Sequence, residues 1–111
     1  MSITSDLIRG HTETIILALL MDQDSYGYEI NKSIKAITHQ QYELKEATLY
    51  SAFRRLEEQG IIDSYWGDEK SGARRRYYRI TSAGKKQYQR NLEDWNEAKQ
   101  MIDALVSRRE R

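Results

Sequence analysis

The spacing of apolar residues changes at residue 60, and this change constrains the fold more than any other feature of the chain. Residues 47–60 read ATLYSAFRRLEEQG and place four apolar side chains on one helical face: Leu49, Ala52, Phe53 and Leu56. Gly60 ends this pattern in the manner of a glycine that follows a helix. The next segments, IIDSYWG at 61–67 and RRRYYRI at 74–80, alternate with the period of two of β-strands, and a glycine lies between them. The sequence therefore predicts a helix followed directly by a β-hairpin.

Two helices are predicted ahead of this one. The first is capped by Thr4 or Ser5 and continues through Met21. Ser25 is a candidate cap for the second helix. The buried stripe of the second helix consists of three isoleucines at i, i+4 and i+7: Ile30, Ile34 and Ile37. Gly27 lies near its start, where a glycine indicates a close approach by another backbone rather than helix propensity.

A short strand and one long helix complete the prediction. The strand is expected around 42–44, and Thr81 caps a final helix that runs from 82 to about 108. At about 1.5 Å per residue this helix spans roughly 40 Å, more than so small a domain can cover. Three helices, a hairpin and a further helix follow the order of winged helix-turn-helix domains. We therefore predict a mainly helical α+β fold, with a winged helix-turn-helix DNA-binding domain at 1–81 and a C-terminal dimerisation helix at 82–111 in the same compact domain.

The basic residues are concentrated around the hairpin. The formal net charge is only +1, yet residues 70–90 contain eight basic residues and no acidic ones. The simplest interpretation is a solvated basic face. On a winged domain, arginines of the hairpin can instead grip phosphates, while short polar side chains on the preceding helix reach base edges, which predicts binding to double-stranded DNA. The alternative is a winged domain that binds an acidic protein partner, although such domains usually lack a basic wing.

Composition argues against several other functions. The chain has no cysteine, and its two histidines, His11 and His39, are far apart without a ligand set, so neither a disulfide nor a metal site is expected. No phosphate-binding glycine loop or nucleophile motif occurs, so we expect neither a cofactor nor enzymatic activity. No apolar run approaches the roughly 18 residues of a membrane span, and no export signal is recognisable, so a cytoplasmic location is expected.

Several motifs together resemble the PadR family of bacterial transcriptional regulators. They are TLYSAFRRLEEQGII at 48–62, YYRIT at 77–81, YGYEI at 26–30 and LIRGHTETIILALL at 7–20. The chain resembles the smaller branch of that family, which has one long terminal helix. The resemblance implies a homodimeric repressor whose last helix packs against the first and last helices of its partner. It also implies that a small aromatic or lipophilic compound, bound at the dimer interface, releases the DNA.

The residues expected to contact DNA form two groups. On and near the recognition helix, which is the third helix, they are Tyr26, Lys45, Thr48, Tyr50, Ser51 and Arg54. On the wing they are Lys70, Ser71, Gly72, Arg74, Arg75 and Arg76. Thr48 and Ser51 are expected to read bases, and the wing to bind phosphates. A two-fold symmetric dimer implies an inverted-repeat operator with half-sites about 34–36 Å apart, or a multiple of that distance.

The final helix carries an apolar stripe at alternating steps of three and four residues. This spacing favours a subunit interface over packing of the stripe on its own domain. The residues expected at the interface are Ile8, Tyr88, Leu92, Trp95, Ile102, Leu105 and Val106. The symmetry axis would bring Trp95 close to its copy, so that two indoles border a flat apolar slot. Planar aromatic effectors are expected in this slot, which would be formed by Ile8, Leu92, Trp95 and Met101.

Overall fold

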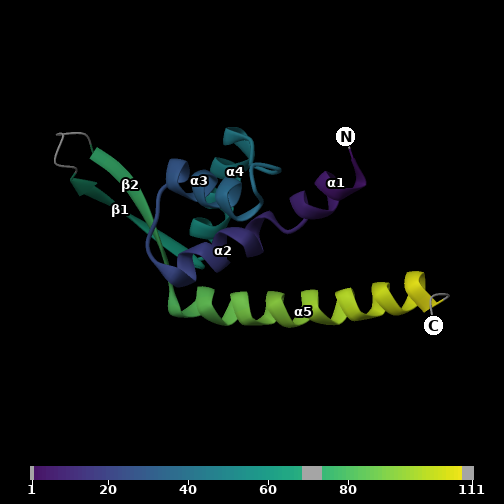
Figure 1. Cartoon of the computed structure of the whole chain (residues 1–111). Coiled ribbons are helices and arrows are strands. Elements are labelled where there is room, and N and C mark those ends of the chain that lie inside the picture. The colour runs from purple at the N-terminus through teal and green to yellow at the C-terminus, as the bar shows by residue number, and fades with distance from the viewer. Residues whose placement is uncertain (1, 69–73, 109–111) are drawn as a thin grey trace.

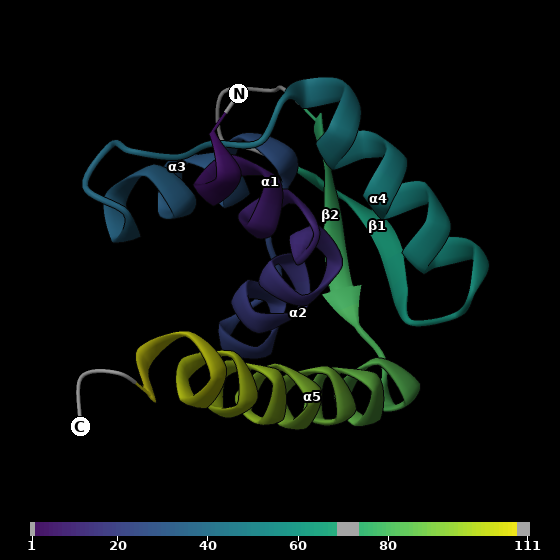
Figure 2. The ribbon, with the colours of Figure 1, turned by 90° about the vertical axis from the view of Figure 1, so that its right-hand side faces the viewer.

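The computed structural model describes residues 2–68 and 74–108 of the 111-residue chain. Its elements, shown in Figure 1, are α1 (Ile3–Arg9), α2 (Thr12–Asp22), α3 (Gly27–Ile37), α4 (Glu46–Glu58), β1 (Ile62–Asp68), β2 (Arg74–Ile80) and α5 (Ser82–Ser107). The two strands pair antiparallel and form the wing. Figures 1 and 2 both show α2 in the middle of the molecule, with α5 along one side of it and α3 and α4 on the other. This arrangement confirms the predicted winged helix-turn-helix fold.

The core lies where α2, α3 and α4 meet the inner face of the wing. Its buried residues are Ile16, Leu17, Leu20, Ile30, Ile34, Leu44, Leu49, Ala52, Phe53, Leu56, Ile61, Ile62, Tyr78 and Ile80. All four apolar residues predicted for α4 are among them, and the rings of Phe53 and Tyr78 stack with centroids 3.9 Å apart. Gly60 follows α4 with a φ of 73°, which confirms the predicted glycine cap. Ile37 was wrongly predicted to be buried: it is 67% exposed because α3 ends there, beyond the core.

The single helix predicted from Thr4 or Ser5 to Met21 is two helices. α1 begins after Ser2, whose hydroxyl accepts a hydrogen bond from the backbone N–H of Ser5 over 3.0 Å. The chain breaks at residues 10–11, where the hydroxyl of Thr12 donates to the carbonyl oxygen of Arg9 over 2.7 Å. This local bond ties a side chain to a carbonyl at the end of α1, an alternative to a continuous helical ladder.

The predicted cap of α3 is also wrong, because Ser25 has a different role. Its backbone N–H and C=O bond to the C=O and N–H of Tyr78 over 3.1 and 2.7 Å, so it forms an isolated bridge at the edge of β2. Its hydroxyl donates to the carboxylate of Glu29 over 2.8 Å. α3 therefore starts after Tyr26, without a side-chain cap, and the bridge joins the start of α3 to the wing.

The strand predicted around 42–44 does not form. The side chain of Asn31 on α3 instead bonds to both backbone groups of Leu44, accepting from its N–H and donating to its C=O, each over 2.8 Å. The hydroxyl of Thr38 accepts from the N–H of Tyr42 over 3.1 Å. Backbone groups that a strand would satisfy in a sheet are thus satisfied by side chains of the neighbouring helix and turn.

α5 begins as predicted, at a cap formed by Thr81. The Thr81 hydroxyl accepts from the N–H of Gly84 over 3.0 Å. A Cβ atom on Gly84 would lie 2.1 Å from the carbonyl oxygen of Ile61, so only glycine permits this close approach. The helix then extends past the rest of the molecule (Figure 1), and the whole chain measures 59 × 30 × 21 Å. In the parts of the chain that the structure describes, no helix is long and apolar enough to span a membrane.

Candidate nucleic-acid interface

The helix α4 presents a polar surface to solvent. Lys45 precedes the helix and is exposed, as is Arg54, whereas Thr48 and Ser51 are half-buried. Tyr50 is 44% exposed. These five residues, which were predicted to contact DNA, therefore belong to the same helix and its N-terminal flank, on the side away from the core. Hydroxyls, an amine and a guanidinium on one helix can serve as hydrogen-bond donors to bases or phosphates.

Arg55, which the helical pattern places on the outer face, contacts another helix. Its Nε donates to the carboxylate of Glu13 on α2 over 2.9 Å. Both side chains are well exposed to solvent, so the pair contributes about 0–1 kcal/mol to stability. Its main consequence is geometric, because it joins the last turn of α4 to the first turn of α2.

The start of α3 packs closely against α4 through an aromatic side chain. A Cβ atom on Gly27 would lie 2.5 Å from the hydroxyl oxygen of Tyr50. The glycine was expected to allow a close approach by backbone, and this expectation is wrong in detail because the approaching atom belongs to a side chain. The ring of Tyr50 also packs edge-on against Phe53, with centroids 5.7 Å apart. Tyr50 therefore fixes the spacing between the two helices of the motif.

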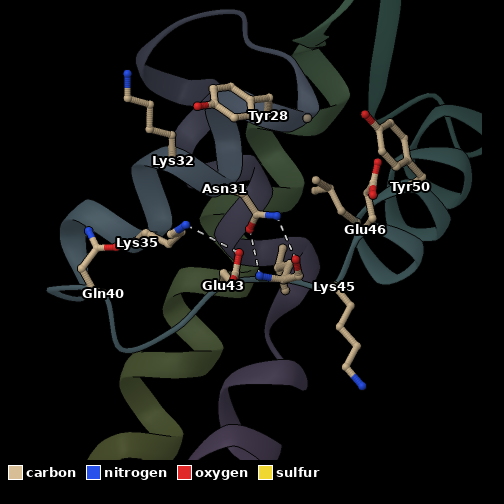
Figure 3. A pocket seen from close by; sticks show the side chains of 12 residues that line it. Tyr28, Asn31, Lys32, Lys35, Gln40, Glu43, Lys45, Glu46 and Tyr50 are labelled. Carbon is tan, nitrogen blue, oxygen red and sulfur yellow. Dashed lines mark hydrogen bonds and ion pairs between the residues drawn. The ribbon is translucent and has the colours of Figure 1, made fainter.

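An open groove of about 760 Å³ lies between α3 and the start of α4 (Figure 3). Tyr28 and Lys32 from α3 and Tyr50 from α4 lie along its rim in Figure 3, and Lys45 extends outward beside it. The polar residues on its floor include Asn31, which holds the backbone of the connecting segment. Tyr28 and Lys32 were not among the predicted contacts. Both lie on the exposed face of α3, opposite the buried stripe of isoleucines that was predicted from the sequence.

Arg76 on β2 faces α4 and is bound within the protein. Its guanidinium donates to the two carboxylate oxygens of Glu57 over 3.2 and 3.3 Å. Its Nε donates to the hydroxyl of Ser64, which itself donates to Glu57 over 2.6 Å. These bonds connect the wing to the second half of α4, so Arg76 has a positioning contact as well as a positive charge.

The other two arginines of the run lie against aromatic rings. The guanidinium carbon of Arg74 is 5.3 Å from the ring centroid of Trp66 on β1. That of Arg75 is 4.6 Å from the ring centroid of Tyr26, at the start of α3. Tyr26 and Arg75, both predicted to contact DNA, are therefore brought together, whereas Lys70, Ser71 and Gly72 lie outside the described residues.

The outer face of the wing is joined to the turn between α2 and α3. Tyr65 and Tyr77 stack with centroids 5.6 Å apart, and Tyr77 packs edge-on against Tyr26 at 5.3 Å. The Tyr65 hydroxyl donates to the carboxylate of Asp24 over 2.6 Å, and this bond raises the pKa of Tyr65. A Cβ atom on Gly67 would lie 2.4 Å from the Tyr77 ring, so the glycine permits that ring to cross β1.

A second surface lies on the side of the molecule away from α4. An apolar pocket of about 310 Å³ between α1, α2 and α5 is lined by Leu7, Ile8, His11, Thr14, Ile15, Ala18, Tyr88, Leu92 and Trp95. Three of the four residues predicted for an effector slot line this pocket; Met101 is not among its lining residues. Trp95 packs edge-on against His11 with centroids 4.8 Å apart. Within residues 2–68 and 74–108, no cluster of three or more histidine, aspartate or glutamate side chains could hold a metal ion.

The last turns of α5 expose apolar side chains. Leu105 and Val106 are 64% and 73% exposed, and Met101 and Ile102 are more than half exposed. Leu7 on α1, which lines the apolar pocket, is 61% exposed. In the described chain these side chains are covered by no other element, so the predicted stripe is exposed at this end. At its start, Tyr88 instead packs against the core of its own domain.

Comparison with known proteins assigns the chain to a family. The model of the transcriptional regulator PadR-like family matches residues 16–90. A transcriptional regulator from Clostridium thermocellum is 52% identical, with a TM-score of 0.86 over 95% of this chain and 99% of that one. A PadR family regulator from Clostridium difficile is 32% identical, with a TM-score of 0.74 over 86% of this chain and 98% of that one. An uncharacterised protein from Lysinibacillus sphaericus is 45% identical over 104 residues, which cover 94% of this chain and 95% of that protein. The chain belongs to the PadR-like family of transcriptional regulators.

Proposed function

We propose that the protein is a homodimeric repressor that binds an inverted-repeat operator through α4 and the wing. The observation that carries this proposal is the position of Arg74 and Arg75 on a wing beside the exposed polar face of α4. In the proposed complex α4 enters the major groove, where Thr48 and Ser51 contact base edges. The wing arginines contact the flanking backbone, and Arg76 holds the wing against α4 through Glu57.

The remaining predicted contacts are proposed to fix the position of the protein on the backbone. Lys45 and Arg54 flank the polar face of α4 and can reach phosphates on either side of the groove. The hydroxyls of Tyr26 and Tyr50 can also donate hydrogen bonds to phosphate oxygens. On the wing, the proposed contacts also include three residues outside the described part of the chain: Lys70, Ser71 and Gly72.

Salt titration with random-sequence duplex DNA tests this function. A DNA-binding regulator loses affinity steeply as salt rises, because each phosphate that it neutralises releases a counterion. The competing function is a protein-interaction module that uses its wing to bind an acidic protein. Such a module would bind duplex DNA weakly. An acidic polypeptide would displace it from DNA of any sequence. Weak DNA binding at low salt would contradict the proposed function.

The apolar end of α5 is the basis for the proposed dimer. Leu105 and Val106 are mostly exposed on a helix that extends beyond its own domain, and Ile102 lies one turn earlier. Burial of such side chains between two subunits removes apolar surface from water, at about 25 cal/mol per Å². The other proposed contacts are Ile8, Tyr88, Leu92 and Trp95.

Sedimentation of two single variants tests the dimer. Leu105→Lys places a charge in the proposed interface and should shift the protein toward monomers that bind DNA poorly. Gln100→Lys adds the same charge at an exposed polar position of the same helix and is the matched control. Truncation after Arg90 should also produce monomers. A truncated chain with the oligomeric state of the full chain would contradict this part of the proposal.

We also propose that a planar aromatic compound binds beside Trp95 and weakens DNA binding. The apolar pocket of about 310 Å³ next to Trp95, Ile8 and Leu92 supports this role, and Met101 is proposed to border the slot in the dimer. The variant Trp66→Phe leaves Trp95 as the only tryptophan, so its fluorescence can be followed during titration with aromatic acids and dyes. A compound that releases DNA equally from the Trp95→Ala variant would show that it acts elsewhere.

A further inference from the structure

A polar pocket of about 540 Å³ lies where α2, α4 and α5 meet. Glu13 lines it from the first turn of α2, and Arg55 lines it from the last turn of α4. Asp94 and Trp95 line it from α5. Trp95 also lines the apolar pocket that is proposed to hold an effector. The recognition helix and the surroundings of Trp95 therefore border one cavity.

Two carboxylates in this polar pocket can pair with the same guanidinium. The Nε of Arg55 donates to the carboxylate of Glu13 over 2.9 Å. Asp94 forms no ion pair or hydrogen bond with any other residue that the structure describes. The remaining arginine that lines the pocket, Arg9, is paired with Asp6. Arg55 therefore has one carboxylate bound on α2 and a second one available on α5.

The ion pair of Arg55 can break without disturbing the core. Both Arg55 and Glu13 are well exposed to solvent, and exposed ion pairs are weak, so exchange of one carboxylate for another costs little free energy. Farther along α2, Ile16 and Leu17 are fully buried and hold the middle of that helix in the close-packed core. The exchange is thus confined to polar side chains at the ends of two helices and in the middle of α5.

We propose that Arg55 exchanges between Glu13 of α2 and Asp94 of α5, and that this exchange couples the surroundings of Trp95 to α4. Asp94 directly precedes Trp95, and His11, which lies two positions before Glu13, packs edge-on against the Trp95 ring. Each pairing therefore acts next to this ring. The inference rests on the proposed function, because it describes how the effector site is linked to DNA binding.

The coupling operates in both directions. A compound beside Trp95 shifts the exchange only if its affinity differs between the two pairings of Arg55. By thermodynamic linkage, DNA that binds α4 must then shift the same equilibrium and alter the surroundings of Trp95. Trp95 lies on α5, on the opposite side of α2 from α4 (Figures 1 and 2), so a response of its indole to DNA reports a change within the protein.

Duplex DNA is the probe, so the effector need not be identified. The full chain with Trp66→Phe retains Trp95 as its only tryptophan. Titration with a labelled random-sequence duplex at low salt gives binding from the anisotropy of the label and, in the same samples, the emission of Trp95. The emission of Trp95 should change on binding, with the same midpoint as the anisotropy.

Two variants in this background restrict Arg55 to one partner. Glu13→Gln leaves it Asp94, and Asp94→Asn leaves it Glu13. Both should bind DNA without the change in Trp95 emission. Glu93→Gln is the matched control: it removes one negative charge from an exposed position of α5 that has no ion pair within the described residues. It should retain the change. Relative to this control, the two variants should shift DNA affinity in opposite directions, by about fivefold or less.

The outcomes separate this inference from the function on which it rests. Absence of salt-dependent DNA binding would overturn both. Binding without a change in Trp95 emission would overturn the coupling alone. The exchange would be refuted by an emission change that persists in Glu13→Gln or Asp94→Asn, or by shifts of their affinities in the same direction. Arg55→Lys keeps a cation for both carboxylates and should retain the emission change; its loss in that variant would also contradict the exchange.

Discussion

Replacement of Glu57 by glutamine should increase the salt dependence of DNA binding, because it releases Arg76 from an ion pair within the protein. Arg76 donates to both carboxylate oxygens of Glu57, over 3.2 and 3.3 Å. The side chains of Arg76 and Glu57 are 47% and 32% exposed to solvent, so the pair contributes about 0–1 kcal/mol to the free energy of unfolding. The substitution should therefore leave the fold intact and expose a cation beside the proposed DNA site.

The size of the effect follows from counterion release. Each phosphate neutralised on duplex DNA adds about 0.9 to the slope of log affinity against log salt. A dimer carries two copies of Arg76, so the slope of log affinity against log salt should be steeper by about 1.8 for the Glu57→Gln variant. Between 50 and 200 mM salt, this change corresponds to an additional loss of affinity of roughly 12-fold. In the wild-type background Arg76→Ala should change the slope much less, because Glu57 already compensates the charge that is removed.

Fluorescence anisotropy with a labelled random duplex measures the slope for the wild type, the two single variants and the double variant. Removal of Arg76 should lower the slope only when Glu57 is already absent. Glu58→Gln is the matched control, because Glu58 is an exposed neighbour that forms no ion pair within the described residues. The reasoning would be refuted if Arg76→Ala lowered the slope by the full amount in the wild-type background, or if Glu57→Gln and Glu58→Gln had equal effects.

Three further predictions follow from other contacts. Gly84→Ala should destabilise the fold by about 1–3 kcal/mol in urea unfolding, because its Cβ would lie 2.1 Å from the carbonyl oxygen of Ile61; an unchanged midpoint would contradict this. Ser51→Ala should alter the preference among operator sequences by roughly 1–3 kcal/mol in competition assays, without a change in salt slope. The bond to Asp24 raises the pKa of Tyr65, so wild-type thermal stability should fall as pH rises above the ordinary value of 10.0, and Tyr65→Phe should reduce this fall.

Elements whose signals are local could be predicted from the sequence. Three signals lie close together around the end of α4: the apolar spacing, the following glycine and the change to a period of two. The structure agrees with each of them. Thr81 was recognisable as a cap because the helical pattern of α5 begins directly after it. These features depend only on residues that are neighbours in the sequence: their backbone preferences and the spacing of their apolar side chains. The sequence shows both directly.

Elements that depend on distant partners could not be predicted in the same way. Residues 42–44 have the composition of a short strand, but Asn31 satisfies the backbone of Leu44 from thirteen positions away in the sequence. Ser25 has the character of a helix cap, but it bridges to Tyr78, a residue of the wing. In each case a tertiary hydrogen bond replaces the local structure that the residue type favours.

The arginine run of the wing shows why the number of positive charges in a sequence can differ from the number of side chains that bind phosphates. The three residues are adjacent in the sequence and have the same charge, but alternation along β2 directs them to different neighbours. Arg75 reaches Tyr26, whereas Arg74 stacks on Trp66. Arg76 is compensated by a carboxylate of α4, so the run adds less net positive charge than its sequence suggests. That carboxylate also accepts from Ser64 of β1, so the residue that compensates Arg76 links both strands of the wing to α4.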